Sequence, residues 1–167
     1  MANLALNLSD LNGSNGFVIN GIDNLDFSGF SVSNAGDING DGIDDLIIGA
    51  YRADPNGQNY AGESYVVFGS RNGFGASFNL SSLDGSNGFV INGIDEFDFS
   101  GRSVSGAGDI NGDGIDDLII GASGADSNGQ SDAGESYVVF GSRNGFEASF
   151  NLSSLDCSNG FGIKGID

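Results

Sequence analysis

Two short stretches of the sequence concentrate oxygen-bearing side chains at a spacing that suits metal coordination. Residues 37–45 and residues 109–117 share the pattern D-x-N-x-D-G-x-x-D without a single difference. Oxygens at the first, third and fifth positions of such a loop converge when a glycine at the sixth position permits a sharp turn. The carbonyl at the seventh position and the carboxylate at the ninth can then complete a shell of oxygens around a cation.

The donor set of each loop favours calcium, which takes about six to eight oxygen ligands in flexible geometry, whereas magnesium demands a stricter octahedron. We therefore predict two Ca²⁺ ions per chain. The alternative interpretation is a plain turn rich in Asp and Asn that holds no metal. The expected ligands are Asp37, Asn39, Asp41, the Ile43 carbonyl and Asp45 in the first loop, and Asp109, Asn111, Asp113, the Ile115 carbonyl and Asp117 in the second.

These loops do not fit the helix–loop–helix calcium motif of EF-hands. That motif needs a bidentate Glu at its twelfth position and flanking helices, whereas Ile48 and Ile120 stand there, inside apolar runs. Asp44 and Asp116, at the eighth position, are expected to face solvent rather than the metal. Arg71 and Arg143 are interpreted as turn residues.

The overall composition excludes several classes of function. The 167 residues carry a net charge of −18 with only five Lys and Arg, so neither nucleic acid nor an anionic membrane surface is a suitable partner. No apolar stretch is long enough for membrane insertion. The chain has no His and only one Cys, Cys157, which excludes Cys/His zinc sites, His-dependent catalytic triads and an internal disulfide.

The sequence is dominated by an internal repeat of 72 residues. Between residues 24–95 and residues 96–167, 59 of the 72 paired positions are identical, and residues 7–23 match residues 79–95 as a third, partial copy. We therefore expect a partial repeat at 1–23, which supplies an outer closing strand, followed by one blade at 24–95 and another at 96–167.

Each repeat contains four predicted strands, separated by turns rich in Gly, Asn and Asp. They lie near residues 30–35, 45–50, 63–68 and 89–92, and we expect the third to have both faces covered. Four strands per repeat of this length predict an all-β fold made of β-propeller blades. A β-solenoid is the alternative, although its rungs would have shorter periods.

The order of these features resembles the FG-GAP repeat of the integrin alpha-subunit β-propeller. The first copy reads Gly-Phe-Ser-Val at 29–32, then the oxygen-rich loop, then an apolar strand that ends in Gly49-Ala50. The resemblance implies a calcium-binding, adhesive module. Ser28 and Ser100 depart from the family's Phe, Tyr51 and Ser123 replace its Pro, and residues 75–87 lengthen the repeat.

A propeller needs more blades than this chain supplies, so either the chain is a fragment of a longer protein or copies associate into a closed ring. Two blades per chain permit only even totals, and a trimer with six blades is our expectation. Residues 17–20 and 161–164 are copies of one outer strand and would compete for one position. Because Gly162 weakens the C-terminal copy, we expect the N-terminal copy of the next subunit to fill that position.

Three functions are compatible with these features. The first is a non-catalytic, extracellular or cell-surface module for adhesion or recognition of a protein or glycan, in which variable positions such as Phe30, Tyr51 and Tyr60 surround a constant scaffold. The second is a structural spacer in a larger surface protein. The third is a carboxylate-dependent hydrolase, which the lack of His and the recurrence of each acid once per repeat disfavour.

Overall fold

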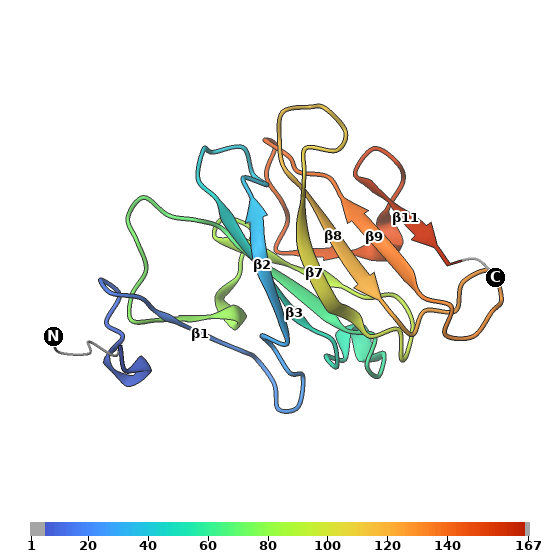
Figure 1. The fold of residues 1–167 in the computed structure, drawn as a ribbon, viewed down its shortest axis with the longest axis horizontal. Coiled ribbons are helices and arrows are strands. Elements are labelled where there is room, and N and C mark those ends of the chain that lie inside the picture. Colours follow the sequence, from blue (N-terminus) through green and yellow to red (C-terminus); the bar gives the residue numbers. More distant parts are fainter. Residues whose placement is uncertain (1–5, 166–167) are drawn as a thin grey trace, which may run out of the picture.

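The computed structural model describes residues 6–165 and shows an all-β chain whose eleven strands form three sheets (Figure 1). Apart from strands, the described part of the chain contains four 3-10 turns of three residues, and none of its helices is long and apolar enough to cross a membrane. The turns are η1 (Leu8–Asp10), η2 (Pro55–Gly57), η3 (Leu80–Ser82) and η4 (Leu152–Ser154).

Each repeat folds into a four-stranded antiparallel sheet, which confirms the predicted strands. The first blade has the order β2-β3-β4-β6 and the second the order β7-β8-β9-β11. The central strands β4 and β9 are flanked on both edges, and the predicted burial of the third strand is confirmed in β4. These strands are β2 (Ser31–Gly36), β3 (Asp45–Ala50), β4 (Glu63–Val67), β6 (Gly88–Asn92), β7 (Ser100–Gly108), β8 (Asp117–Ala122), β9 (Glu135–Val139) and β11 (Gly160–Lys164).

Three shorter strands connect each blade to its predecessor. β10 (Ser149–Asn151) leaves the second repeat and pairs in parallel with β6, so it becomes the fifth strand of the first blade's sheet. β1 (Val18–Asn20) pairs with β5 (Ser77–Asn79) in the same register. Residues 75–87, which lengthen this repeat relative to the family, therefore contain the strand that pairs with the preceding outer strand.

The outer position of the second blade is occupied by β11, which pairs with β9 from Gly160 to Lys164. We expected the N-terminal copy to fill this position, and that expectation is wrong for the single chain. β11 belongs to the same repeat as β9, with residues 140–159, which include β10 and η4, between them, so it reaches this position by closure within one chain. β1 instead lies along the side of the first blade.

The main hydrophobic core lies between the two blades, which stand face to face in Figure 1. Because side chains alternate across a strand, β3 and β8 each contribute residues to both faces of their sheet. Ile47 and Val66 of the first blade meet Leu118 and Tyr137 of the second. A second cluster, which includes Ile48 and Tyr65, fills the opposite face of the first blade.

Candidate functional site

The two oxygen-rich loops lie at the same end of their blades, along the upper edge of Figure 1. Residues 37–45 join β2 to β3, and residues 109–117 join β7 to β8. The backbone N–H of Asp37 donates to Oδ2 of Asp116 at 2.9 Å. The loops of neighbouring blades are therefore in direct contact.

The side chains of the first loop hold its turn together. The carboxylate of Asp37 accepts the N–H of Asp41 at 2.9 Å and the N–H of Gly42 at 2.8 Å. Oδ1 of Asn39 accepts the Asp41 N–H at 2.9 Å, and Oδ1 of Asp41 accepts the Ile43 N–H at 2.9 Å. The first, third and fifth positions are thus gathered around the amides of residues 41–43.

The second loop repeats this arrangement with small differences. The Asp109 carboxylate accepts three N–H groups, from residues 112, 113 and 114, at 2.7 to 3.0 Å. Oδ1 of Asn111 accepts the Asp113 N–H at 2.8 Å, and Oδ1 of Asp113 accepts the Ile115 N–H at 2.9 Å. The side-chain amide of Asn111 also donates to Oδ2 of Asp113 at 2.9 Å.

The aspartate at the ninth position of each loop is buried beneath it. Asp45 accepts the N–H of Ile38 at 3.1 Å and of Gly69 at 2.7 Å, and Asp117 accepts those of Ile110 and Gly141, both at 2.9 Å. Burial raises the pKa of Asp45 to about 6, against the effect of its two amide donors, and Asp41 and Asp37 raise it further. A nearby cation would reverse that trend because it favours the charged form.

The donor chemistry of both loops fits calcium. Each loop gathers two carboxylates and one amide oxygen at a single turn, with a third carboxylate at its base. Each oxygen that accepts an N–H retains a second lone pair. Among residues 6–165, no three acidic side chains form a compact cluster that could hold a metal by themselves. Amide and backbone oxygens would therefore have to take part, as in the predicted shell.

Two contacts around the loops were missed by the sequence analysis. Asp116 was expected to face solvent, but it is half-buried and accepts the N–H of Asp37 from the preceding blade. Arg71 donates to the Asp41 carbonyl at 3.2 Å, and Arg143 donates to the Gly114 carbonyl at 3.0 Å. Each arginine therefore supports the loop of its own blade. In both repeats the arginine stands 30 residues after the fifth position of the loop, and this constant spacing was the available signal.

Acidic residues also gather at the opposite end of each blade, beside a cavity of about 530 Å³ in the second blade. Burial raises the pKa of Asp98 to about 6, and Asp95 and Glu135 contribute to the shift. Oε2 of Glu135 accepts the Tyr137 hydroxyl at 2.9 Å, and Oε1 lies 3.6 Å from Nζ of Lys164. The first blade repeats the arrangement with Glu63 and Tyr65.

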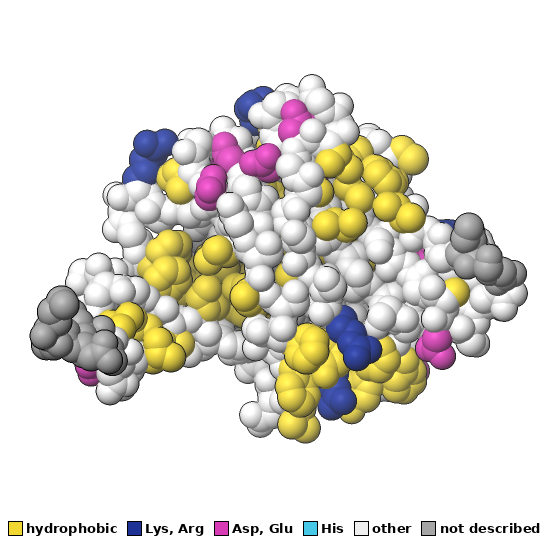
Figure 2. Space-filling model, viewed as in Figure 1, with side chains coloured by type: hydrophobic (Ala, Val, Ile, Leu, Met, Phe, Trp, Pro, Cys, Tyr) yellow, Lys and Arg dark blue, Asp and Glu magenta, His cyan; other side chains and the backbone are white. Residues whose placement is uncertain are grey.

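A group of aromatic and arginine side chains lies at this second end, and we call it the aromatic face. The rings of Phe30 and Tyr51 are 4.6 Å apart, and the Arg52 guanidinium lies 4.9 Å from the Phe27 ring centre and 5.8 Å from that of Tyr60. Figure 2 shows basic side chains among hydrophobic ones along the lower edge of the molecule, opposite the oxygen-rich loops. Its members are Phe27, Phe30, Tyr51, Arg52, Tyr60, Phe97, Phe99 and Arg102.

The aromatic face unites positions that differ between the repeats. Phe30, Tyr51, Arg52 and Tyr60 correspond to Arg102, Ser123, Gly124 and Asp132 in the second blade. The variation of these positions is visible in the sequence. Their meeting is not, because the contacts join turns that are distant in the sequence.

Comparisons with known proteins agree with this architecture. The FG-GAP repeat family matches residues 28–67 and 100–139. The chain is 36% identical to Integrin alpha pat-2 of Caenorhabditis elegans over 94 residues, which are 56% of this chain and 7% of that protein. It is 36% identical to Integrin alpha-2 of Mus musculus over 96 residues, 58% of this chain and 8% of that protein.

A third relative is the phosphatidylinositol-glycan-specific phospholipase D of Bos taurus, 32% identical over 134 residues. That match spans 78% of this chain and 15% of the relative. The chain therefore covers only a small part of each of these proteins. The first family match begins three residues before β2 and ends with β4, and the second begins with β7 and ends with β9. With one match in each of its two blades, the chain contains two FG-GAP repeats.

Proposed function

We propose that this chain is a non-catalytic, calcium-stabilised module for recognition or adhesion outside the cell or at its surface. The observation that supports it most directly is the pair of identical loops, each of which gathers oxygen ligands at one turn of an FG-GAP blade. The integrin alpha chains among its relatives agree with an adhesive role.

Calcium would be held by the loop side chains and by one carbonyl in each blade. The residues are Asp37, Asn39, Asp41, Asp45 and the Ile43 carbonyl, with Asp109, Asn111, Asp113, Asp117 and the Ile115 carbonyl in the second loop. Bound calcium supplies positive charge that offsets the repulsion between these carboxylates. The loops then fix the ends of β2 and β3, and of β7 and β8, at the edge where neighbouring blades touch.

Recognition would take place at the aromatic face, at the other end of the blades. Exposed Tyr, Phe and Arg side chains are the types that dominate binding surfaces, because rigid rings offer contact area at low entropic cost. Arg52 lies over three rings, an arrangement in which the planar edge of its guanidinium can donate to a partner. A protein or glycan that presents acidic or hydroxyl groups beside an apolar face suits this surface.

An extracellular location follows from the type of site. Extracellular calcium modules bind with dissociation constants of about 0.1 to 1 mM, and such sites fill only where calcium is plentiful. A structural spacer would share the loops but would not use the aromatic face. Catalysis is the weaker candidate, because the acids Asp98 and Glu135 have counterparts in the first blade and each is bonded within its own blade.

The test is thermal unfolding with added calcium and then with EDTA. If calcium at about a hundred times its dissociation constant binds only the folded chain, each site adds about 2.7 kcal/mol of stability. We expect a rise of many degrees in the melting temperature, and magnesium at the same concentration serves as the control. Equal melting temperatures in calcium and EDTA, with tightly bound metal excluded by elemental analysis, would reduce the loops to plain turns.

A further inference from the structure

A pocket beside the turn that follows β4 recurs beside the equivalent turn after β9, and we call it the loop-end pocket. In the first blade it has a volume of about 320 Å³ and is lined by the rings of Phe68, Phe74 and Phe78. In the second blade it has a volume of about 350 Å³, and the counterparts of these three rings line it. Both volumes are large enough for a small ligand.

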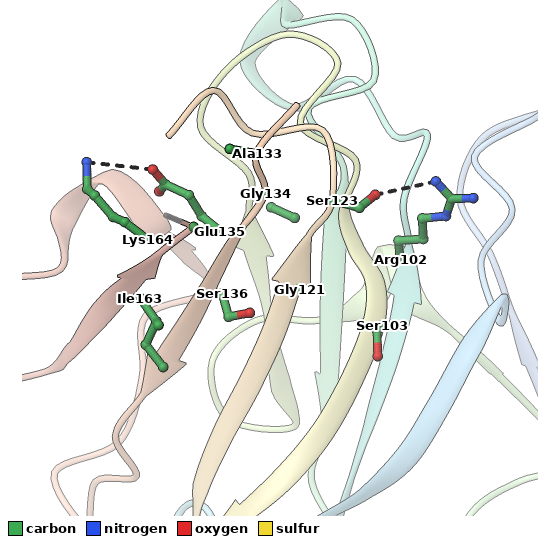
Figure 3. A pocket seen from close by; sticks show the side chains of 12 residues that line it. Arg102, Ser103, Gly121, Ser123, Ala133, Gly134, Glu135, Ser136, Ile163 and Lys164 are labelled. Carbon is green, nitrogen blue, oxygen red and sulfur yellow. Dashed lines mark hydrogen bonds and ion pairs between the residues drawn. The ribbon is translucent and has the colours of Figure 1, made fainter. Parts of the chain in front are cut away.

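The recurrence of the loop-end pocket shows that neither neighbouring blade covers it. The pocket of the second blade is open although the first blade precedes it, and the pocket of the first blade is open although the second blade follows it. The largest hollow, of about 660 Å³ between β8, β9 and β11 (Figure 3), differs in this respect. Its equivalent in the first blade is filled by Ser100 and Gly101, which a side chain on Gly49 or Gly62 would overlap. The loop-end pocket is therefore built by each repeat itself.

One wall of the pocket comes from residues 75–87, which lengthen the repeat relative to the family. The carbonyl and the side chain of Asn87 fix this wall through three hydrogen bonds of 2.9 to 3.1 Å, one of them from the N–H of Phe68 on the other wall. Asn159 makes the same three bonds in the second repeat. The wall is thus in place before any ligand binds.

The aromatic rings of the pocket are also held in place. Phe17, which does not line the pocket, stacks on Phe74 with ring centres 4.2 Å apart, and Phe78 meets Phe74 edge-on at 5.9 Å. In the second repeat Phe89 stacks on Phe146 in the same way, at 4.1 Å. The rings therefore present a preformed apolar surface, which lowers the entropic cost of binding.

Two serine hydroxyls on the wall offer the two halves of a hydrogen bond. Oγ of Ser70 accepts the N–H of Asn72 at 3.2 Å, so its own proton remains for a ligand. Oγ of Ser86 donates to Oδ1 of Asp84 at 2.7 Å, so its lone pairs remain. Both arrangements recur at the equivalent serines of the second repeat. A hydroxyl on the ligand can accept from the first serine and donate to the second.

The charge of the pocket narrows the ligand further. The wall of the first pocket consists of Phe, Gly, Ser and Asn residues, so a cation finds no opposite charge there. The net charge of −18 disfavours an anion. A purely apolar group would leave the serine hydroxyls without partners. The wall therefore suits a neutral ring that has C–H groups on one face and hydroxyls at its edge.

We propose that each loop-end pocket binds one neutral sugar ring of a glycan, with the C–H face of the ring against the phenylalanines and its hydroxyls at the two serines. The proposal rests on the recognition function proposed above, for which it names the ligand and adds a site apart from the aromatic face. Two pockets on one chain can bind a repeating glycan bivalently. The pockets differ at one wall position, where Gly75 of the first corresponds to Glu147 of the second. The Glu147 carboxylate can accept further hydroxyls, so the second pocket binds the ring more tightly.

The pocket adjoins the proposed calcium site, which sets the conditions of the test. The N–H of Gly69 donates to Oδ1 of Asp45 at 2.7 Å, and Arg71 donates to the Asp41 carbonyl at 3.2 Å. The turn that carries Ser70 is therefore bonded to the oxygen-rich loop. Binding is measured with the full chain in calcium, on polymers that carry glucose, galactose, mannose or N-acetylglucosamine, and a sialic acid polymer is the anionic control.

We expect at least one neutral polymer to bind and the sialic acid polymer not to bind. Ser70→Ala combined with Ser142→Ala removes one donor from each pocket and should weaken binding by about tenfold. The matched control combines Ser81→Ala with Ser153→Ala, two exposed serines outside the pockets, and should bind as the wild type does. The absence of binding to every neutral polymer, or equal binding by the two double variants, would overturn the proposal.

A blocking variant tests the location of the site independently. An added Cβ at Gly75 would lie 3.8 Å from the Ser77 carbonyl, its nearest neighbour, so this position accepts a side chain. Gly75→Trp combined with Glu147→Trp should fill both pockets and abolish binding with an unchanged circular dichroism spectrum. Binding that survives in this variant would place the sugar elsewhere and overturn the assignment. Glu147→Gly should weaken binding without abolishing it, and unchanged binding would contradict the proposed role of the carboxylate.

Two outcomes separate this proposal from its neighbours. A leucine-rich peptide that binds in place of every sugar, and is released by the blocking variant, would assign the pocket to apolar side chains instead. If calcium raises the melting temperature but no sugar binds, the proposed function stands and the glycan assignment fails. If a sugar binds while the melting temperatures in calcium and EDTA are equal, the glycan assignment stands and the calcium sites fail.

Discussion

The two ends of the blades contrast in how much their sequences vary. At the loop end, residues 36–50 are identical to residues 108–122, and nearly every polar side chain there accepts a backbone N–H. At the other end, five aligned positions of the aromatic face differ between the repeats, and their contacts are made by exposed rings and guanidinium groups. Side chains that satisfy backbone amides tolerate little change, whereas an exposed face can change without disturbing the fold.

The largest effect is expected from the buried aspartate of a loop. Asp117→Ala leaves the N–H groups of Ile110 and Gly141 without their acceptor. Leaving one buried and one partly buried donor without a partner should cost about 2 to 4 kcal/mol of unfolding free energy, measured by urea denaturation in EDTA. Asp95→Ala, an exposed acid at the other end, is the control and should change stability by less than about 0.5 kcal/mol. Equal losses of unfolding free energy in Asp117→Ala and Asp95→Ala would show that the two ends of the blades do not differ in this way.

A smaller effect is expected from a loop side chain that faces the turn. Asp109→Asn keeps one oxygen for the amides of residues 112–114 but removes a charge from the proposed calcium site. We expect the calcium-dependent part of the stability to fall by about 2.7 kcal/mol, the contribution of one filled site. Calorimetric titration should then count one site instead of two. An unchanged count would place calcium elsewhere.

The pH dependence of stability tests a buried acid, Asp98, at the end of the blades opposite the oxygen-rich loops. Burial raises the pKa of Asp98 to about 6, from its ordinary value of 3.8. The folded chain therefore holds this proton more tightly than the unfolded chain does, so its contribution to stability is full below pH 3.8 and declines as the pH rises towards 6. Asp98→Asn should remove a decline on the order of 1 to 3 kcal/mol, seen as the difference between the two proteins in EDTA. Parallel profiles would show that Asp98 ionises normally.

The smallest effect is expected at the aromatic face. Tyr51→Ser and Arg52→Gly give the first blade the residues that the second blade has at Ser123 and Gly124. The lost ring contacts should cost about 1 kcal/mol or less, measured by thermal unfolding, and the calcium response should be unchanged. Binding to a partner that uses this face should be abolished. A loss of the calcium response would mean that the two ends are coupled.

The strands and the loops could be predicted because both depend on local patterns. Apolar runs such as residues 45–50 and 63–67 fall between Gly-rich turns, and the oxygen spacing recurs without change in both repeats. The short strands β5 and β10 could not be predicted, since three residues such as Ser77–Asn79 pair only with a strand from the preceding repeat. The contacts of Asp116 and the meeting of Tyr60 with Phe97 also depend on the packing of one blade against the next.

The parallel pairing of β10 with β6 has a consequence for how the chain unfolds. The sheet of the first repeat is completed by three residues of the second, and the side-chain amide of Asn92 donates to Asn151 and Ser149, both at 2.9 Å. Unfolding of the second repeat therefore exposes the edge of the first and opens the core that they share. We expect the two repeats to melt as one cooperative unit rather than as independent modules. The first repeat loses the fifth strand of its sheet when it is cut from the second, whereas β7, β8, β9 and β11 all belong to the second repeat.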